Sequence, residues 1–501
     1  MDPSVKIIVF LILFLFILPV MTAACCYFPI LRHVYFAGMF YFTISGYAIN
    51  IYPMPDWTGT AREYAFSAVS FFAIPLLFSM ILSTKHKVRF FPPGVFFYFL
   101  YYLAILLSGI NAIHIHPWGF EVCKMFWMYV TFLAAFNYFT HTKNLTYYCY
   151  LLCAILLILF LVGLNQKYRL GKYQIPSTFP HQNSLSLYLE QYGLLSLGIL
   201  MNEKMSKKLF FLILCAFGGS ILLIIFTYSR GGLVVYFGGI ALICAISILL
   251  NGLSLRRLTL MLIGLLVLLS IIGYALPRII QRFTNAPEQS KNTRIGLAIA
   301  AKRMADDYRL GVGANNFSEY SGTLHDYSTT EFFIPGRERA GIVETIYLLV
   351  AAECGWWGLG TLLLWFFYYY LSAGISMFVL RKKPCDGFVI GVFGGLTCNY
   401  WHSTLEWSLK QYNNFAGQMI LYALVAAIAV HRKEIVAAYR RSMAMEKAGK
   451  APARSLPAPS SEKPAGELLP LPEPRNDSPP VPEQESIPGP ADPHTAIPEK
   501  A

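Results

Sequence analysis

Residues 227–232 join two long apolar runs and place Arg230 directly before Gly231 and Gly232. A guanidinium group carries its N–H donors in a fixed fork, which suits the oxygens of a diphosphate or another anionic headgroup. The alternative is an arginine whose side chain only extends to the interface between membrane and water. This segment alone leaves both interpretations open.

A second basic group lies in residues 165–183. Its cations are Lys167, Arg169 and Lys172. His181 and Asn183 end the segment, and we include them with the three cations as candidate substrate-binding residues. A local anionic partner would explain the cluster, but contact with lipid phosphate is the simpler explanation for any basic loop beside a membrane.

The polar stretch 277–344 adds further arginines. Its residues 292–308 read as a helix with Arg294 at the start. The expected shared face consists of Ile295, Ala298, Ile299, Lys302 and Ala305. Such a helix could lie against the membrane and cover a site at the lipid surface, whereas a solvated helix without a role is the alternative. Arg337 and Arg339, near the end of the stretch, are also substrate-binding candidates.

Two carboxylates follow, Glu344 where an apolar run begins and Glu353 deeper within it. A carboxylate inside a membrane is costly unless it is paired or hydrated, so both are candidates for a functional role. Glu121, Glu190 and Glu406 are isolated acids near the ends of apolar runs and receive no role.

The pattern offers no metal site. His114 and His116 lack a third ligand, and the ten cysteines show no ligand spacing. We therefore expect no metal and no essential divalent cation.

The elements that must position these residues are membrane helices. Of the 501 residues, 56% are hydrophobic and only 13% are charged, against roughly 25% in a soluble domain. This composition excludes a soluble globular enzyme and a disordered chain, and it indicates a polytopic membrane protein. The formal charge of +13 needs a separate explanation, in topology or in a binding site.

The expected fold class is all-α, a transmembrane bundle of about 12 or 13 helices. The runs are 5–24, 30–50, 63–82, 93–113, 119–139, 146–164, 208–227, 231–250, 257–276, 345–379 and 414–431, with 184–201 and 386–402 as weaker candidates. We divide the chain into N-terminal helices (1–164), a catalytic region (165–435) and a disordered, Pro-rich tail (448–501).

Lysines and arginines of short loops set the orientation. One set of alternate loops holds most of them, including Lys85, Lys143, Lys204, Arg256 and Arg381, and should be cytoplasmic. The C-terminus is then cytoplasmic, and the stretch 277–344 lies on the outer face.

Several stretches, in this order, resemble the O-antigen ligase and polymerase superfamily of polytopic glycan transferases. They are Ser177 to Asn183, Tyr228 to Gly232, Thr293-Arg294, Leu310 to Phe317, Tyr347-Leu348 and Glu353 to Gly358. The resemblance implies glycan transfer without a metal or other cofactor, on the periplasmic face of a bacterial inner membrane. It implies an undecaprenyl-diphosphate-linked glycan as donor, and lipid A-core, another glycan or a protein hydroxyl as acceptor. Membrane lipids are the remaining expected partners, and no nucleic acid is expected.

By this resemblance, Arg230 and Arg294 would hold the diphosphate. The family usually carries a His-Asn pair before the Tyr-Leu, and its His is the proposed base, but here Glu344 and Thr345 occupy those positions. Glu344 could accept the proton in its place. Alternatively, the acceptor differs, His325 is the base, or the protein is inactive.

Two other classes remain open: a transporter or flippase of an anionic lipid-linked substrate, and a non-catalytic assembly protein that recruits a synthase through its tail. A transporter would place ionisable residues near the middle of several helices.

Overall fold

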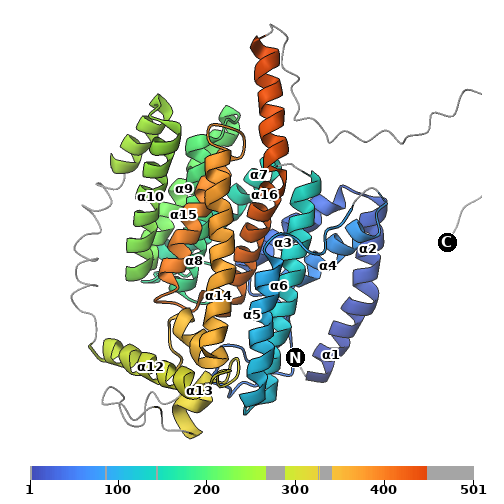
Figure 1. The fold of residues 1–501 in the computed structure, drawn as a ribbon, viewed down its shortest axis with the longest axis vertical. Coiled ribbons are helices and arrows are strands. Elements are labelled where there is room, and N and C mark those ends of the chain that lie inside the picture. Colours follow the sequence, from blue (N-terminus) through green and yellow to red (C-terminus); the bar gives the residue numbers. More distant parts are fainter. Residues whose placement is uncertain are drawn as a thin grey trace, which may run out of the picture. The chain divides into compact units, whose positions relative to one another are not determined.

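Helices form most of the chain, as the apolar composition predicts (Figure 1). The computed structural model describes residues 3–84, 87–142, 145–266, 288–324, 327 and 341–447. The helices are α1 (Pro3–Ile12), α2 (Leu18–Tyr27), α3 (Leu31–Tyr41), α4 (Ala68–Ile81), α5 (Val95–Ser108), α6 (Ile115–Thr142), α7 (Leu145–Leu164), α8 (Gln182–Asn202), α9 (Lys207–Thr227), α10 (Arg230–Asn251), α12 (Glu288–Asp307), α13 (Phe317–Glu319), α14 (Ile346–Val379), α15 (Asp386–His402) and α16 (Tyr412–Lys447). Short 3-10 or π segments are η1 (Leu13–Ile17), η2 (Phe42–Ile44), η3 (Gly109–Asn111), η4 (Asn165–Arg169), η5 (Tyr320–Leu324) and η6 (Ser408–Lys410).

Seven helices within the described residues are long and apolar enough to cross a membrane. They are Ser4–Tyr27, Ile115–His141, Leu145–Arg169, Lys207–Thr227, Arg230–Asn251, Ile346–Val379 and Tyr412–Glu446. Two shorter apolar helices, Ala68–Ile81 and Val95–Asn111, accompany them. The larger number of 12 or 13 spans stays a prediction, and the tail 448–501 lies outside the described residues.

The run 30–50 is not a single helix, contrary to expectation. Helix α3 ends at Tyr41, and the chain enters strand β1 (Ala48–Ile51), which pairs antiparallel with β2 (Tyr64–Ser67). Hydropathy reports burial rather than backbone conformation, so a continuous apolar run can contain both a helix and a strand.

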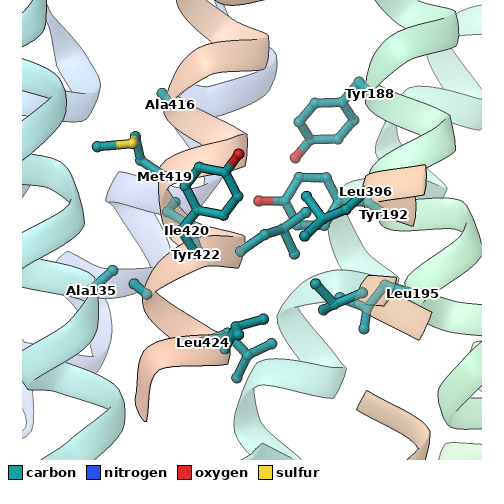
Figure 2. Close-up of a cluster of buried hydrophobic side chains, with 14 of the residues drawn as sticks. Ala135, Tyr188, Tyr192, Leu195, Leu396, Ala416, Met419, Ile420, Tyr422 and Leu424 are labelled. Atoms are coloured by element: carbon teal, nitrogen blue, oxygen red, sulfur yellow. The ribbon is translucent and has the colours of Figure 1, made fainter. Parts of the chain in front are cut away.

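Helices α8 and α15, the two weak span candidates, pack closely against each other. A methyl group on Gly198 would lie 2.4 Å from Gly391 Cα, so these two backbones touch. Small residues permit such close helix contacts. Tyrosines and aliphatic side chains of α8, α15 and α16 fill the neighbouring core (Figure 2). The low hydropathy of α8 reflects polar side chains that it buries, including Glu190 and Gln191.

Helix α14 is broken at Gly355, whose φ is +73°. The segment that follows α12 packs into the break: Val312 N donates to Ala352 O at 2.9 Å, and Gly313 N donates to Glu353 O at 3.0 Å. A methyl group on Gly355 would lie 2.1 Å from Arg309 O, so only glycine fits. The backbone of residues 312–313 therefore joins the region after α12 to α14.

Helix α12 is present as expected but begins at Glu288, before residue 292. Leu297, Ala300, Ala301 and Met304 are buried, and α12 packs against α14. Of the face that we expected, Ala305 is also buried and Ala298 packs against the same cluster, whereas Ile295 is 36% exposed.

Candidate functional site

Arg294 and Glu344, far apart in the sequence, form a salt bridge. Arg294 Nη2 lies 2.5 Å from Glu344 Oε2, and the two side chains are 43% and 37% exposed. Helix α12 carries the arginine, and the residues that lead into α14 carry the glutamate. The packing of α12 on α14 therefore brings together two of the three residues that the sequence assigned to catalysis.

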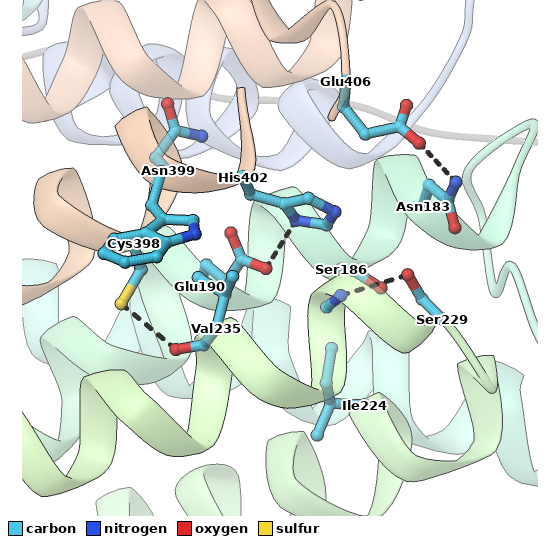
Figure 3. A network of polar contacts seen from close by, with 12 residues as sticks. Asn183, Ser186, Glu190, Ile224, Ser229, Val235, Cys398, Asn399, His402 and Glu406 are labelled. Atoms are coloured by element: carbon cyan, nitrogen blue, oxygen red, sulfur yellow. Dashed lines mark hydrogen bonds and ion pairs between the residues drawn. The ribbon is translucent and has the colours of Figure 1, made fainter. Parts of the chain in front are cut away.

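Glu406 lies in the loop between α15 and η6, near enough for the charges of Arg294 and Glu344 to act on it. The Asn183 amide, at the start of α8, donates a hydrogen bond to Glu406 Oε1 (Figure 3). The side chain is nearly buried, and burial raises the pKa of Glu406 to about 7. That rise in the pKa is opposed by the positive charges of His402 and Arg294 and by the hydrogen bond from Asn183. The negative charge of Glu344 adds to it. This carboxyl group therefore changes protonation near neutral pH.

His402, the last residue of α15, forms a buried pair with Glu190 of α8. His402 Nδ1 lies 2.7 Å from Glu190 Oε1, and the side chains are 2% and 0% exposed (Figure 3). The other ring nitrogen faces the start of α10, because a methyl group on Gly231 would lie 3.0 Å from His402 Nε2. The carboxylate fixes the orientation of the imidazole, as in other carboxylate–histidine pairs.

Arg230 opens α10 at the same place. Ser229 caps the helix by accepting a hydrogen bond from Gly232 N at 3.2 Å. A methyl group on Gly232 would lie 2.6 Å from Ser186 Oγ, so the glycine lets α10 approach α8. Arg230 forms no salt bridge with any described residue, and the positive end of the helix dipole adds to its charge. An anion is the natural ligand for this helix start.

The basic segment 165–183 lies against the end of α9. Lys167 Nζ is 5.2 Å from the ring centre of Tyr228, and Tyr173 stacks on the same ring at 5.0 Å. Lys167 is thus placed beside the segment that leads to Arg230. Arg169 and Lys172 are exposed and form no salt bridge with a described residue.

His181 caps α8: its Nδ1 accepts a hydrogen bond from Asn183 N at 3.2 Å. Burial lowers the pKa of His181, which favours the neutral ring that this bond requires. His181 therefore holds the start of α8, where Asn183 reaches Glu406.

Glu353 belongs to a separate buried cluster, which we call the ionic quartet: Glu121, Lys124, Glu353 and Lys410. Lys410 Nζ lies 2.5 Å from Glu353 Oε2 and 3.3 Å from Glu121 Oε2, and Lys124 Nζ lies 2.7 Å from Glu121 Oε1. Burial lowers the pKa of Lys410, but Glu121 and Glu353 outweigh burial and raise that pKa. Glu353 is therefore paired, as a carboxylate at this depth requires.

The structure brings some of the expected site residues together, and others lie outside the residues that it describes. Arg294, Glu344 and Asn183 meet around Glu406, and Arg230 adjoins His402 through Gly231. Arg337, Arg339 and His325 lie outside the described residues. No group of three or more potential metal ligands occurs in the part of the chain that the structure describes.

Sequence reasoning missed Glu190, His402 and Glu406 as functional residues. Their spacing matches no motif that we recognised, and Glu190 lies more than 200 residues before the other two. The available signal was their presence at the ends of apolar runs, where a charge needs a partner.

Comparison of the chain with models of known protein families, and with curated proteins, gives no match.

Proposed function

We propose that the protein transfers a glycan from an undecaprenyl-diphosphate-linked donor to a hydroxyl acceptor, on the periplasmic face of a bacterial inner membrane. The observation that carries this proposal is the salt bridge between Arg294 and Glu344, whose charges both act on the carboxyl group of Glu406. A cation for a leaving anion and carboxylates that can accept a proton are the two requirements of such a transfer.

Arg294 and Arg230 would bind the diphosphate. As the bond from the sugar to the diphosphate breaks, negative charge accumulates on the phosphate oxygens. Guanidinium groups already in position stabilise that charge more in the transition state than in the ground state. Lys167, Arg169 and Lys172 would add a positive field around the donor.

Glu344 occupies the position of the family histidine, so it is one candidate for the base. A carboxylate takes the proton of an acceptor hydroxyl as the oxygen attacks the sugar. Its salt bridge with Arg294 also suits a second role, holding the guanidinium toward the donor.

A transporter of an anionic lipid-linked substrate is the second candidate, because the ionic quartet buries four charged side chains within the helical bundle. Two features favour the enzyme instead. The quartet pairs its charges internally, and the exposed pair of Arg294 and Glu344 lies just before the start of α14 rather than midway along it. A non-catalytic assembly protein remains the third candidate, and deletion of residues after Lys450 tests it: unchanged polysaccharide length and amount would exclude a role for the tail in recruitment.

Transfer by the purified protein tests the proposal directly. The assay supplies a lipid-diphosphate glycan and a panel of lipid A-core, glycan and protein acceptors, and it measures the product and the released undecaprenyl diphosphate. Arg230→Ala and Arg294→Ala should each lower the rate by about 10²-fold or more. A transporter would move the donor across proteoliposomes without releasing diphosphate.

Arg303→Ala is the matched control, because Arg303 is an exposed arginine of the same helix α12. It should transfer at the wild-type rate. Normal surface polysaccharide in a deletion strain that expresses either Arg230→Ala or Arg294→Ala would refute the assignment of these residues.

A further inference from the structure

The loop that carries Glu406 is fixed at both ends by buried ion pairs. At its start, His402 pairs with Glu190 at 2.7 Å. At its end, Lys410 pairs with Glu353 at 2.5 Å. The loop is short, and its two anchors belong to α8 and α14, so its position relative to both helices is set. Such a support is what a preorganised catalytic group needs.

Hydrogen bonds also attach this loop to the residues beside Glu344. Ile346 N donates to Ser403 O at 3.1 Å, and Thr345 Oγ1 donates to the same carbonyl at 3.4 Å. Within the loop, the hydroxyl groups of Ser403 and Ser408 are 2.7 Å apart. These hydrogen bonds join the residues that follow Glu344 to the loop that carries Glu406.

The two carboxylates have different surroundings. Glu344 Oε2 forms an ion pair with Arg294, whereas Glu406 has a neutral amide, Asn183, as its hydrogen-bond donor. A carboxylate that directs an arginine and a carboxylate that accepts a proton need these two different environments.

We propose that Glu406 accepts the proton of the acceptor hydroxyl, and that Glu344 instead positions Arg294. This inference rests on the proposed glycan transfer. The acceptor oxygen forms a bond to the anomeric carbon of the donor sugar while its proton passes to the Glu406 carboxylate. The bond from that carbon to the diphosphate oxygen breaks, and its electron pair leaves on the diphosphate beside Arg294 and Arg230. Glu406 then returns the proton to water.

The titration of Glu406 agrees with this role. Burial is the main cause that raises its pKa to about 7, and a base is most effective when its pKa is near the working pH. The charged groups that face it are His402 from α15, Arg294 from α12 and Glu344 from the start of α14. Only the deprotonated form can act, so the transfer rate should rise with pH through about 7.

Transfer by the purified full-length protein, measured as kcat and KM from pH 5 to pH 9, tests the inference. Glu406→Gln should lower kcat by about 10²-fold to 10⁴-fold at pH 8 and should remove the rise near pH 7. Glu344→Gln should mainly raise KM for the donor and keep that rise. A Glu406→Gln variant with the wild-type rate and pH profile would overturn the inference, as would a Glu344→Gln variant that loses the rise.

Asn183→Ala provides a test that does not depend on removing Glu406. The hydrogen bond from the Asn183 side chain lowers the pKa of the Glu406 carboxyl group. Removing that hydrogen bond should therefore move the midpoint of the pH profile to higher pH. An unchanged midpoint would contradict the assignment. An inactive wild-type protein would instead refute the proposed function itself, which distinguishes the two failures.

Discussion

The ionic quartet and the group around Glu406 use the same kinds of side chain in opposite ways. In the quartet, two lysines neutralise two glutamates, and no side chain is more than 8% exposed. Around Glu406, Arg294 and Glu344 are about 40% exposed, and a nearly buried carboxyl group has a pKa of about 7. In the quartet every charged group has a partner of opposite charge, which indicates a structural role. Around Glu406 the burial of the carboxyl group is not fully offset by positive charge, which indicates a site prepared for a ligand.

The largest expected effect belongs to the quartet. Lys410→Met leaves Glu353 and Glu121 without their shared cation, which should lower the free energy of unfolding by about 3–5 kcal/mol. The midpoint of thermal unfolding in detergent measures it. Adding Glu353→Gln should recover part of the loss, because one fewer buried negative charge then remains.

Lys433→Met, on the exposed surface of α16, is the control and should change little. A Lys410→Met protein with the wild-type unfolding midpoint would contradict the structural role of the quartet.

The second effect, that of Glu406→Gln, is an increase in the free energy of unfolding rather than a decrease. The pKa of Glu406 is raised from 4.5 to about 7, so the folded protein binds more protons than the unfolded chain between these values. Its contribution to stability is therefore greatest below about pH 4.5 and declines as the pH rises toward 7. Glu406→Gln should be more stable than the wild type at pH 8, by up to about 3 kcal/mol, and nearly equal at pH 5.

Unfolding midpoints at the two pH values measure this difference, with Glu446→Gln as an exposed control on α16. A Glu406→Gln protein that is less stable than the wild type at pH 8 would place Glu406 with the structural quartet.

The smallest effect concerns Lys167, which contacts aromatic rings rather than a carboxylate. Lys167→Ala should lower the free energy of unfolding by only about 0.5–1 kcal/mol, the range for a cation–π contact at an exposed site. Denaturant titration measures it. A loss as large as that of Lys410→Met would show that the basic segment 165–183 supports the fold.

The sequence was sufficient for the helical class and for part of the site. Arg294 was selected by the family resemblance and Glu344 by its place where an apolar run begins, and the structure pairs them. The shared face of α12 was predicted only in part: Ala305 is buried and Ala298 is packed as expected, but Ile295 is exposed.

Glu190, His402 and Glu406 could not be grouped from sequence. Glu190 and His402 meet only because α8 and α15 pack together, and that pairing depends on glycine contacts that no local pattern reveals. Asn183 was selected for its neighbourhood, but its partner, Glu406, lies 223 residues away.

The contact of Gly198 with Gly391 has a consequence for the whole of this chemistry. Helix α8 holds Asn183 and Glu190, and α15 with the loop after it holds His402 and Glu406. The distance between the two helix axes therefore determines how closely the Asn183 amide approaches the Glu406 carboxyl group. An alanine at either glycine would push the two helices apart, far from the reacting atoms. It would weaken the hydrogen bond from Asn183 and so raise the pKa of Glu406, although no polar residue had been replaced.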